Sequence, residues 1–415
     1  MIRLLAPLLL LLAPLLLLLA ATAPASARTI AIVNGKIVTM GPAGTVEGGT
    51  VIVRDGKIVS VAKGGAVPAD AEVIDAKGKW VTPGLFDSSS QLGLVELVAF
   101  ANANDASARG SRYSAAFDVQ FGLSAGITSL AVARSQGITR AAAVPAAGAH
   151  IFSGFGALVT MKPQDPILLR SRAFQFVELG TTGATNAGGA RGAAWIEFLD
   201  ALRMAKAGAE PAYSEKALKQ ADLEAIRPVV EGIVPLMVHV ERASDILQVL
   251  ALRSSYPRLR PILFGAAEGW MVAREIAEAR IPVILCPFVS LPSSFETLAA
   301  TRRNAAILGE AGVTLAFMPA PKPDVPMVGQ LRQGAGIAVA YGLSWEDALR
   351  AVTLGPAEIF GVGAQLGSLD VGKTADLVVW NGDPLELSSY AEKVLIGGRT
   401  ASLITRQDEL RDRYR

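Results

Sequence analysis

The stretch VPLMVHVERASDILQVLALRSSYPRLRPILFG, residues 234–265, decides the fold. Two nearly continuous apolar runs, 234–240 and 260–265, flank a segment from Ser244 to Leu252 in which apolar residues recur at helical spacing. Continuously apolar strands are what a parallel sheet buried on both faces requires, and a helix commonly connects two such strands. The stretch therefore predicts one strand–helix–strand unit of a parallel sheet.

The same alternation extends over residues 83–363. Further apolar runs of strand length are GITSLAVA, GAHIFSG, IPVILCP and GVTLAFM, at 126–133, 148–154, 281–287 and 312–318. Alanine-rich stretches with helical spacing, Trp270 to Ala279 and Phe295 to Gly309, lie between some of them. Strand–helix alternation of this length predicts an α/β fold, a distorted TIM-type (β/α)8 barrel.

Both ends of the chain show short strands and turns instead. TIAIVNGKIVTM predicts two strands joined at Asn34-Gly35, and GTVIVRDGKIVSVA predicts a second hairpin at Asp55-Gly56. Strand-like sequence returns in GSLDVGKTADLVVWNGDPLE near the C-terminus. Since a closed barrel cannot take extra strands, we expect residues 28–82 and 364–415 to form one small composite β-sandwich domain. The charged tail, 406–415, is expected to be solvent-exposed.

Composition excludes several classes of protein. Of the 415 residues 51% are apolar and 18% charged, which excludes a disordered chain. A net charge of +2 and 6% aromatic residues argue against nucleic acid as a partner. The single cysteine, Cys286, excludes an internal disulfide.

The first 27 residues have the pattern of a targeting segment. Arg3 precedes a leucine-rich run, and Ala25-Ser26-Ala27 has the small-x-small pattern of a cleavage site. Residues 1–27 are therefore predicted to be a signal peptide; an uncleaved membrane anchor is the alternative. We expect an exported protein, periplasmic or secreted, without membrane contact once the leader is removed.

Three segments carry a resemblance to a known family. NGKIV with DGKIVSV, DAKGKWVTPGLFDSSSQLG, and GSLDVGKTADLVVWNGDPLE look like the amidohydrolase superfamily, in particular its imidazolonepropionase-like branch. The resemblance implies a barrel flanked by a composite β-domain. It also implies hydrolysis of carbon–nitrogen bonds other than peptide bonds, in cyclic amides or related small molecules, with Zn²⁺ or another divalent metal as cofactor.

The sequence departs from the family where the metal should bind. Ser89 and Gln91 stand where the family has a His-x-His pair. His239 is retained, but no histidine stands near Gly265 and no aspartate near Ala320. One ligand cannot hold a catalytic Zn²⁺, which needs about three protein ligands and one open position. We therefore predict no metal ligands and no cofactor.

Two residues are the candidates for catalysis. His239 ends a predicted barrel strand, where barrel enzymes place functional side chains, and suits a general base. The alternative is an inherited remnant that hydrogen-bonds inside the barrel. Glu268 follows the next strand. A carboxylate near His239 would raise the pKa of His239 and orient the imidazole ring. The alternative for Glu268 is a loop glutamate that caps a helix.

Asp87, Ser89 and Gln91 are the candidates for substrate binding. They follow the first barrel strand and offer hydrogen-bonding groups to a small polar ligand. The alternatives are a structural role for Asp87 and ordered water at the other two positions.

Three functions are compatible with these residues. The first is hydrolysis that is weak or independent of metal. The second is a pseudoenzyme that binds a small polar ligand at the barrel mouth. The third is a structural partner in a homo- or hetero-oligomer with a related amidohydrolase. Replacing His239 by alanine would abolish turnover in the first case and only weaken binding in the second.

Overall fold

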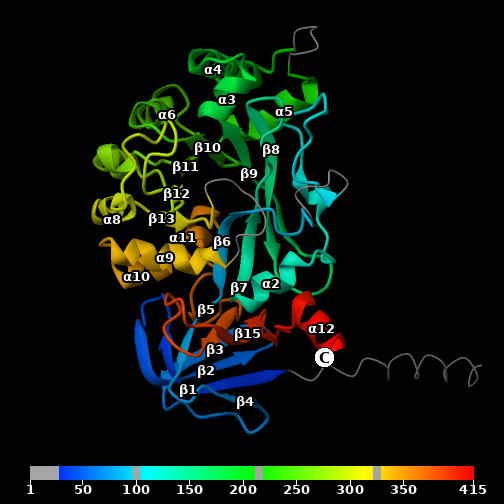
Figure 1. The fold of residues 1–415 in the computed structure, drawn as a ribbon, viewed down its shortest axis with the longest axis vertical. Helices are drawn as coiled ribbons and strands as arrows, with labels where there is room; N and C mark the ends of the chain where they lie inside the picture. The colour runs from blue at the N-terminus through cyan, green and yellow to red at the C-terminus, as the bar shows by residue number, and fades with distance from the viewer. Residues whose placement is uncertain (1–27, 97–102, 211–217, 321–328) are drawn as a thin grey trace, which may run out of the picture.

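The computed structural model describes residues 28–96, 103–210, 218–320 and 329–415. The chain forms two parts, a barrel-like sheet surrounded by helices and a second sheet beneath it (Figure 1). The predicted leader, 1–27, lies outside the described residues. No helix within these ranges is both long and apolar enough to cross a membrane.

The second sheet unites strands from both ends of the chain. It has eight strands in the order β16-β15-β14-β5-β1-β2-β3, with β4 paired to β1. The strands are β1 (Thr29–Val38), β2 (Thr45–Arg54), β3 (Lys57–Lys63), β4 (Glu72–Asp75), β5 (Trp80–Pro83), β14 (Leu377–Trp380), β15 (Ala391–Ile396) and β16 (Arg399–Thr400).

Pairing of β5 with β14 joins the two ends of the chain. The strands are antiparallel, with Trp80 opposite Trp380, and the Trp380 ring N–H donates to the Thr82 hydroxyl at 2.8 Å. Beside this junction the buried side chain of Arg140 reaches from the barrel to Asp376, with 2.9 Å between Nη2 and Oδ1. The sheet built from both chain ends confirms the predicted composite β-part of the fold.

The structure corrects one predicted hairpin and confirms the other. β1 runs without a break through Asn34-Gly35, where shifts in register with β2 mark a bulge instead of a turn. Asn34 has a positive φ of 58°, and a side chain on Gly35 would meet Val81 at 2.8 Å. A bulge lets β1 keep apolar side chains in the core on both sides of it. Asp55-Gly56 does join β2 to β3.

The first sheet forms the barrel. Its order is β13-β12-β11-β10-β9-β8-β7-β6. The strands are β6 (Leu85–Ser90), β7 (Ile138–Ala143), β8 (Phe152–Thr160), β9 (Leu168–Glu178), β10 (Leu236–Val240), β11 (Pro261–Gly265), β12 (Val283–Leu285) and β13 (Leu315–Phe317).

Two features account for the distortion of the barrel. β8 is antiparallel to both of its neighbours, whereas the other pairs are parallel. The edge strands β6 and β13 are bridged by neighbouring carbonyls: Phe86 N–H donates to Val352 at 2.8 Å and Phe317 N–H donates to Ala351 at 2.9 Å. These bonds give hydrogen-bond partners to backbone N–H groups that would otherwise be unpaired at the two edges of the sheet. The prediction of a distorted TIM-type barrel is confirmed.

Helices cover the outside of the barrel (Figure 1). They are α2 (Ser129–Ser135), α3 (Thr181–Asn186), α4 (Arg191–Ala207), α5 (Gln220–Val230), α6 (Ala243–Ser255), α7 (Ala273–Ala279), α8 (Asn304–Glu310), α9 (Gln330–Ala340), α10 (Trp345–Arg350) and α11 (Leu354–Ile359), with 3-10 helices η2 (Val119–Gly122) and η3 (Gly269–Val272). The charged tail forms α12 (Arg406–Arg413), which has no buried residue.

Two predicted strands are misplaced. The run 126–133 belongs largely to α2, which contacts both β7 and β15, and the strand is the following segment, β7. The run 148–154 overlaps only the start of β8. Because α2 is covered on two sides, its apolar residues form a continuous run that looks like a buried strand.

Candidate functional site

His239 lies at the carboxyl end of β10 with its side chain buried at the barrel mouth. Its ring meets the Phe264 ring edge to face, with 5.5 Å between centroids, and Phe264 meets Phe176 in the same way at 5.3 Å. These phenylalanines belong to the apolar cluster that fills the barrel interior. His239 is therefore the point at which an apolar interior meets the polar mouth.

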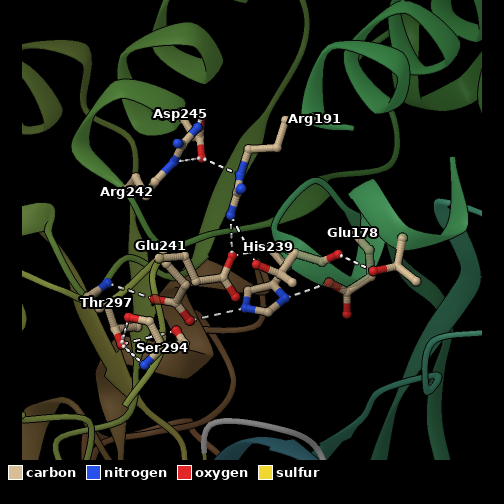
Figure 2. A network of polar contacts seen from close by, with 12 residues as sticks. Glu178, Arg191, His239, Glu241, Arg242, Asp245, Ser294 and Thr297 are labelled. Atoms are coloured by element: carbon tan, nitrogen blue, oxygen red, sulfur yellow. Dashed lines mark hydrogen bonds and ion pairs between the residues drawn. The ribbon is translucent and has the colours of Figure 1, made fainter. Parts of the chain in front are cut away.

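Carboxylates contact both nitrogens of the His239 ring. Nδ1 lies 2.5 Å from Oε2 of Glu178, the last residue of β9, and Nε2 lies 3.1 Å from Oε1 of Glu241 (Figure 2). The second oxygen of Glu241 accepts the Ala267 N–H at 2.8 Å. The imidazole is thus held between two fixed acceptors.

A glycine makes room for this arrangement. Gly265 has a φ of +91°, and a Cβ there would lie 2.6 Å from Glu241 Oε1. The Glu241 carboxylate therefore occupies the space beside Gly265. The resemblance would place a histidine near this position. A side chain at Gly265 would displace that carboxylate from His239.

The two carboxylates determine the charge of His239. Burial alone lowers its pKa, but the charge and hydrogen bond of Glu178, with those of Glu241, outweigh burial and raise the pKa of His239 well above its ordinary value of 6.5. The carboxylates therefore favour the imidazolium form of His239, in which the ring donates from both nitrogens. In this state it has no lone pair with which to take a proton or bind a metal.

The loop after β12 is anchored beside this cluster. Glu296 accepts the Thr181 N–H at 2.7 Å and pairs with Arg191 at 2.8 Å. Burial raises its pKa, but the bonds from Thr181 and the charges of His239 and Arg191 lower it below the ordinary value. Arg191 Nε also lies 3.5 Å from Asp245 Oδ2. Figure 2 shows Arg191 between Asp245 and the His239 cluster. The mouth thus carries a network of alternating charges.

Glu268 does not take part in the His239 cluster. Its two oxygens accept the backbone N–H groups of Ala243, at 3.0 Å, and Ala299, at 3.3 Å. Ala243 is the first residue of α6, so Glu268 caps a helix from the next strand's loop. Glu178 and Glu241 provide the carboxylates that we expected from Glu268.

The candidates for substrate binding are all buried: Asp87 and Ser89 belong to β6, and Gln91 follows it directly. Asp87 Oδ1 accepts the Ser89 N–H at 3.0 Å, while Asp87 Oδ2 and the Ser89 hydroxyl have no partner in the described part of the chain. Gln91 is 4% exposed. No hydrogen bond connects these three residues to His239 within the described ranges. They form a separate buried polar group.

Asp87 should make stability depend on pH. Burial raises its pKa from 3.8 to about 7, against the opposing hydrogen bond from Ser89. The folded chain then holds a proton that the unfolded chain has released, so the free energy of unfolding falls as pH rises through this range, by about 1.4 kcal/mol per pH unit. We expect a loss of about 2–3 kcal/mol between about pH 5 and pH 7 by urea denaturation.

Asp87→Asn should remove that slope, because asparagine keeps the acceptor for Ser89 N–H and cannot ionise. Asp200→Asn, at an exposed position on α4, is the matched control and should keep the slope. An unchanged slope in Asp87→Asn would show that Asp87 is ionised throughout the range.

The described residues of the barrel mouth do not fit a catalytic divalent metal. In the described residues, no three His, Cys, Asp or Glu side chains are placed to hold one ion. The matching positions carry Ser89, Gln91, Gly265 and Ala320, and both nitrogens of His239 face carboxylates. Neutral oxygens bind such metals far more weakly than imidazole does.

The barrel and its polar mouth define a TIM-type protein with a composite β-domain, and comparisons identify its family. Residues 80–401 match the model of the amidohydrolase family, and the chain belongs to this family. An imidazolonepropionase from Acidiphilium cryptum is 26% identical over 387 residues, which span 85% of this chain and 93% of that protein. Another, from Sphingopyxis alaskensis, is 39% identical over 70 residues, or 17% of each chain.

The solved structures agree on the fold. An amidohydrolase from Thermotoga maritima MSB8 superimposes with a TM-score of 0.80 and 24% identity, over 91% of this chain and 100% of that one. A molinate hydrolase has a TM-score of 0.54 and 18% identity, over 91% of this chain and 95% of that one. These similarities support the predicted resemblance.

Proposed function

We propose that the chain is an exported amidohydrolase-family protein that binds small amide-type carbon–nitrogen compounds at its barrel mouth without a divalent metal. Family membership and the imidazolonepropionase relatives support the class of ligand. The leader-like pattern of residues 1–27 supports export. The observation that carries the proposal is His239 held by carboxylates at both ring nitrogens.

This arrangement favours binding over metal-dependent hydrolysis. An imidazolium between Glu178 and Glu241 cannot activate water as a base, and no nearby metal position lowers the pKa of water. The carboxylate oxygens around it can accept from the N–H of a small amide, and the Arg191 guanidinium beside them can donate to its carbonyl oxygen. The protein is therefore a ligand-binding member of a hydrolase family.

Hydrolysis without metal is the second candidate. The 2.5 Å contact between Glu178 and His239 has the geometry of a pair that orients a general acid or base. If Glu241 moved away from Nε2, it could take a proton from water as the water oxygen adds to the carbonyl carbon, and His239 could give its proton to the leaving nitrogen as the carbon–nitrogen bond breaks. This candidate needs the ring to change its partner during the reaction.

Titration of hydantoin, a cyclic amide, separates the two candidates. We expect saturable binding by calorimetry in metal-free buffer and no ring opening by NMR. Glu241→Gln should weaken binding at least about tenfold, the effect of about 1.4 kcal/mol; His150→Gln, at the other histidine, should not. Ring opening that Glu241→Gln abolishes would favour the hydrolase instead. No binding of hydantoin would contradict both.

Metal content provides a second test. After incubation with Zn²⁺ and dialysis against a mild chelator, purified protein should contain well under one metal per chain by elemental analysis. The reason is that the positions of Ser89, Gln91 and Gly265 offer no strong ligand. Stoichiometric metal that survives dialysis would overturn this part of the proposal.

A further inference from the structure

A cavity lies at the end of the barrel opposite His239. It has a volume of about 310 Å³, and its lining includes Pro235, Pro261, Pro282 and Thr314, which begin or precede β10 to β13. His239 ends β10, so the length of the strand separates the two places. Volumes of this order are typical of sites for small molecules.

The floor of the cavity is apolar. Leu259, Ile262, Ile281 and Ile359 line it, and all four are buried. They come from the starts of neighbouring strands and from α11, so the floor is part of the packed barrel. A ligand seated here would bury apolar surface against this floor, which favours binding.

The rim of the cavity is basic. Arg253, Arg260 and Arg280 line it, and Arg253 donates to the carbonyl of Ala279, next to Arg280. Arg260 and Arg280 have no side-chain ion pair or hydrogen bond within the described ranges. Three guanidinium groups around one cavity repel one another unless an anion lies between them.

Among the described residues of the lining, the one acidic side chain, Glu358, does not neutralise this charge. Both oxygens of Glu358 are occupied by Arg350, at 2.7 and 2.6 Å. Guanidinium groups bind carboxylates and phosphates through two parallel hydrogen bonds. The free donors of Arg260 and Arg280 are therefore available to an external anion.

We propose that this basal cavity binds an organic anion, with its carboxylate or phosphate head at the arginines and an apolar body on the isoleucine and leucine floor. The arginines and the apolar floor are two independent observations. Exposed arginines occur without an apolar floor, and a buried apolar floor occurs without arginines at its rim. The site is independent of the function proposed for the mouth.

Calorimetry with sodium octanoate tests the proposal on the full chain. We expect saturable binding at about one site per chain, with octyl phosphate binding comparably. Octanol, which lacks the charge, and inorganic phosphate, which lacks the apolar body, should each bind at least about tenfold more weakly. If octyl phosphate binds and octanoate does not, the head group of the ligand is a phosphate and not a carboxylate.

Paired variants locate the site. Arg260→Gln/Arg280→Gln should weaken octanoate binding at least about tenfold, whereas Arg203→Gln/Arg274→Gln, at exposed arginines elsewhere, should leave it unchanged. Thermal melting confirms that both proteins are folded. The proposal is overturned if neither octanoate nor octyl phosphate saturates, if the Arg260→Gln/Arg280→Gln protein binds them normally, or if octanol or inorganic phosphate binds as tightly.

Discussion

Removal of residues 364–415 should leave a chain that does not fold into soluble protein. β5 loses β14, its antiparallel partner, and Thr82 loses the ring N–H of Trp380. Arg140 is left with its charge buried and without Asp376, and breaking such a buried pair alone costs about 3–5 kcal/mol. Native proteins have only about 5–15 kcal/mol of stability, so this loss, together with the loss of three strands of the sheet, should leave too little for folding.

A shorter deletion is the control for this experiment. Removing residues 406–415 takes away only α12, which has no buried residue. This chain should stay soluble and melt at the temperature of the full protein. If the longer deletion also stayed soluble with unchanged melting, the two ends of the chain would not form one domain.

His239→Ala should destabilise the fold by about 3–5 kcal/mol, because it leaves Glu178 and Glu241 buried without the cation between them. The contribution of His239 is fully present below about pH 6.5 and is lost as pH rises through its raised folded pKa. Urea denaturation at about pH 6 measures the largest difference between variant and parent.

A triple variant, His239→Ala/Glu178→Gln/Glu241→Gln, distinguishes charge from packing. Neutral side chains in place of the two unpaired carboxylates should restore part of the lost stability, whereas a packing defect should persist. His150→Ala removes the other histidine, which is partly exposed, and should change stability by less than about 0.5 kcal/mol. A loss in His239→Ala no larger than that control would show that the three side chains do not form an ionic cluster.

The barrel could be predicted where the strands are buried on both faces. β10 to β13 lie within the apolar runs that proline or glycine delimits, as expected for parallel strands. The strand before β8 was misplaced because α2, which packs against both β7 and β15, also has an apolar run of strand length. Periodicity cannot separate a buried helix from a buried strand when the run is short.

The site was only partly predictable for a related reason. His239 stands out at the end of a strand, and Glu241, two residues on, had a detectable signal because alternate residues share a face of a strand. Glu178 had none, because it meets His239 through the register of β9 with β10. That register is a long-range property, and β9 lies where the sequence pattern is least regular.

The protonation state of His239 tests most directly whether this mouth holds an imidazolium in place of a metal. The chain has two histidines, so nitrogen-15 NMR of the rings can be assigned with His150→Gln alone. At neutral pH both nitrogens of His239 should carry protons, and the signals should not move when Zn²⁺ is added in equimolar amount. One unprotonated ring nitrogen, or a shift that saturates at one Zn²⁺ per chain, would contradict the account.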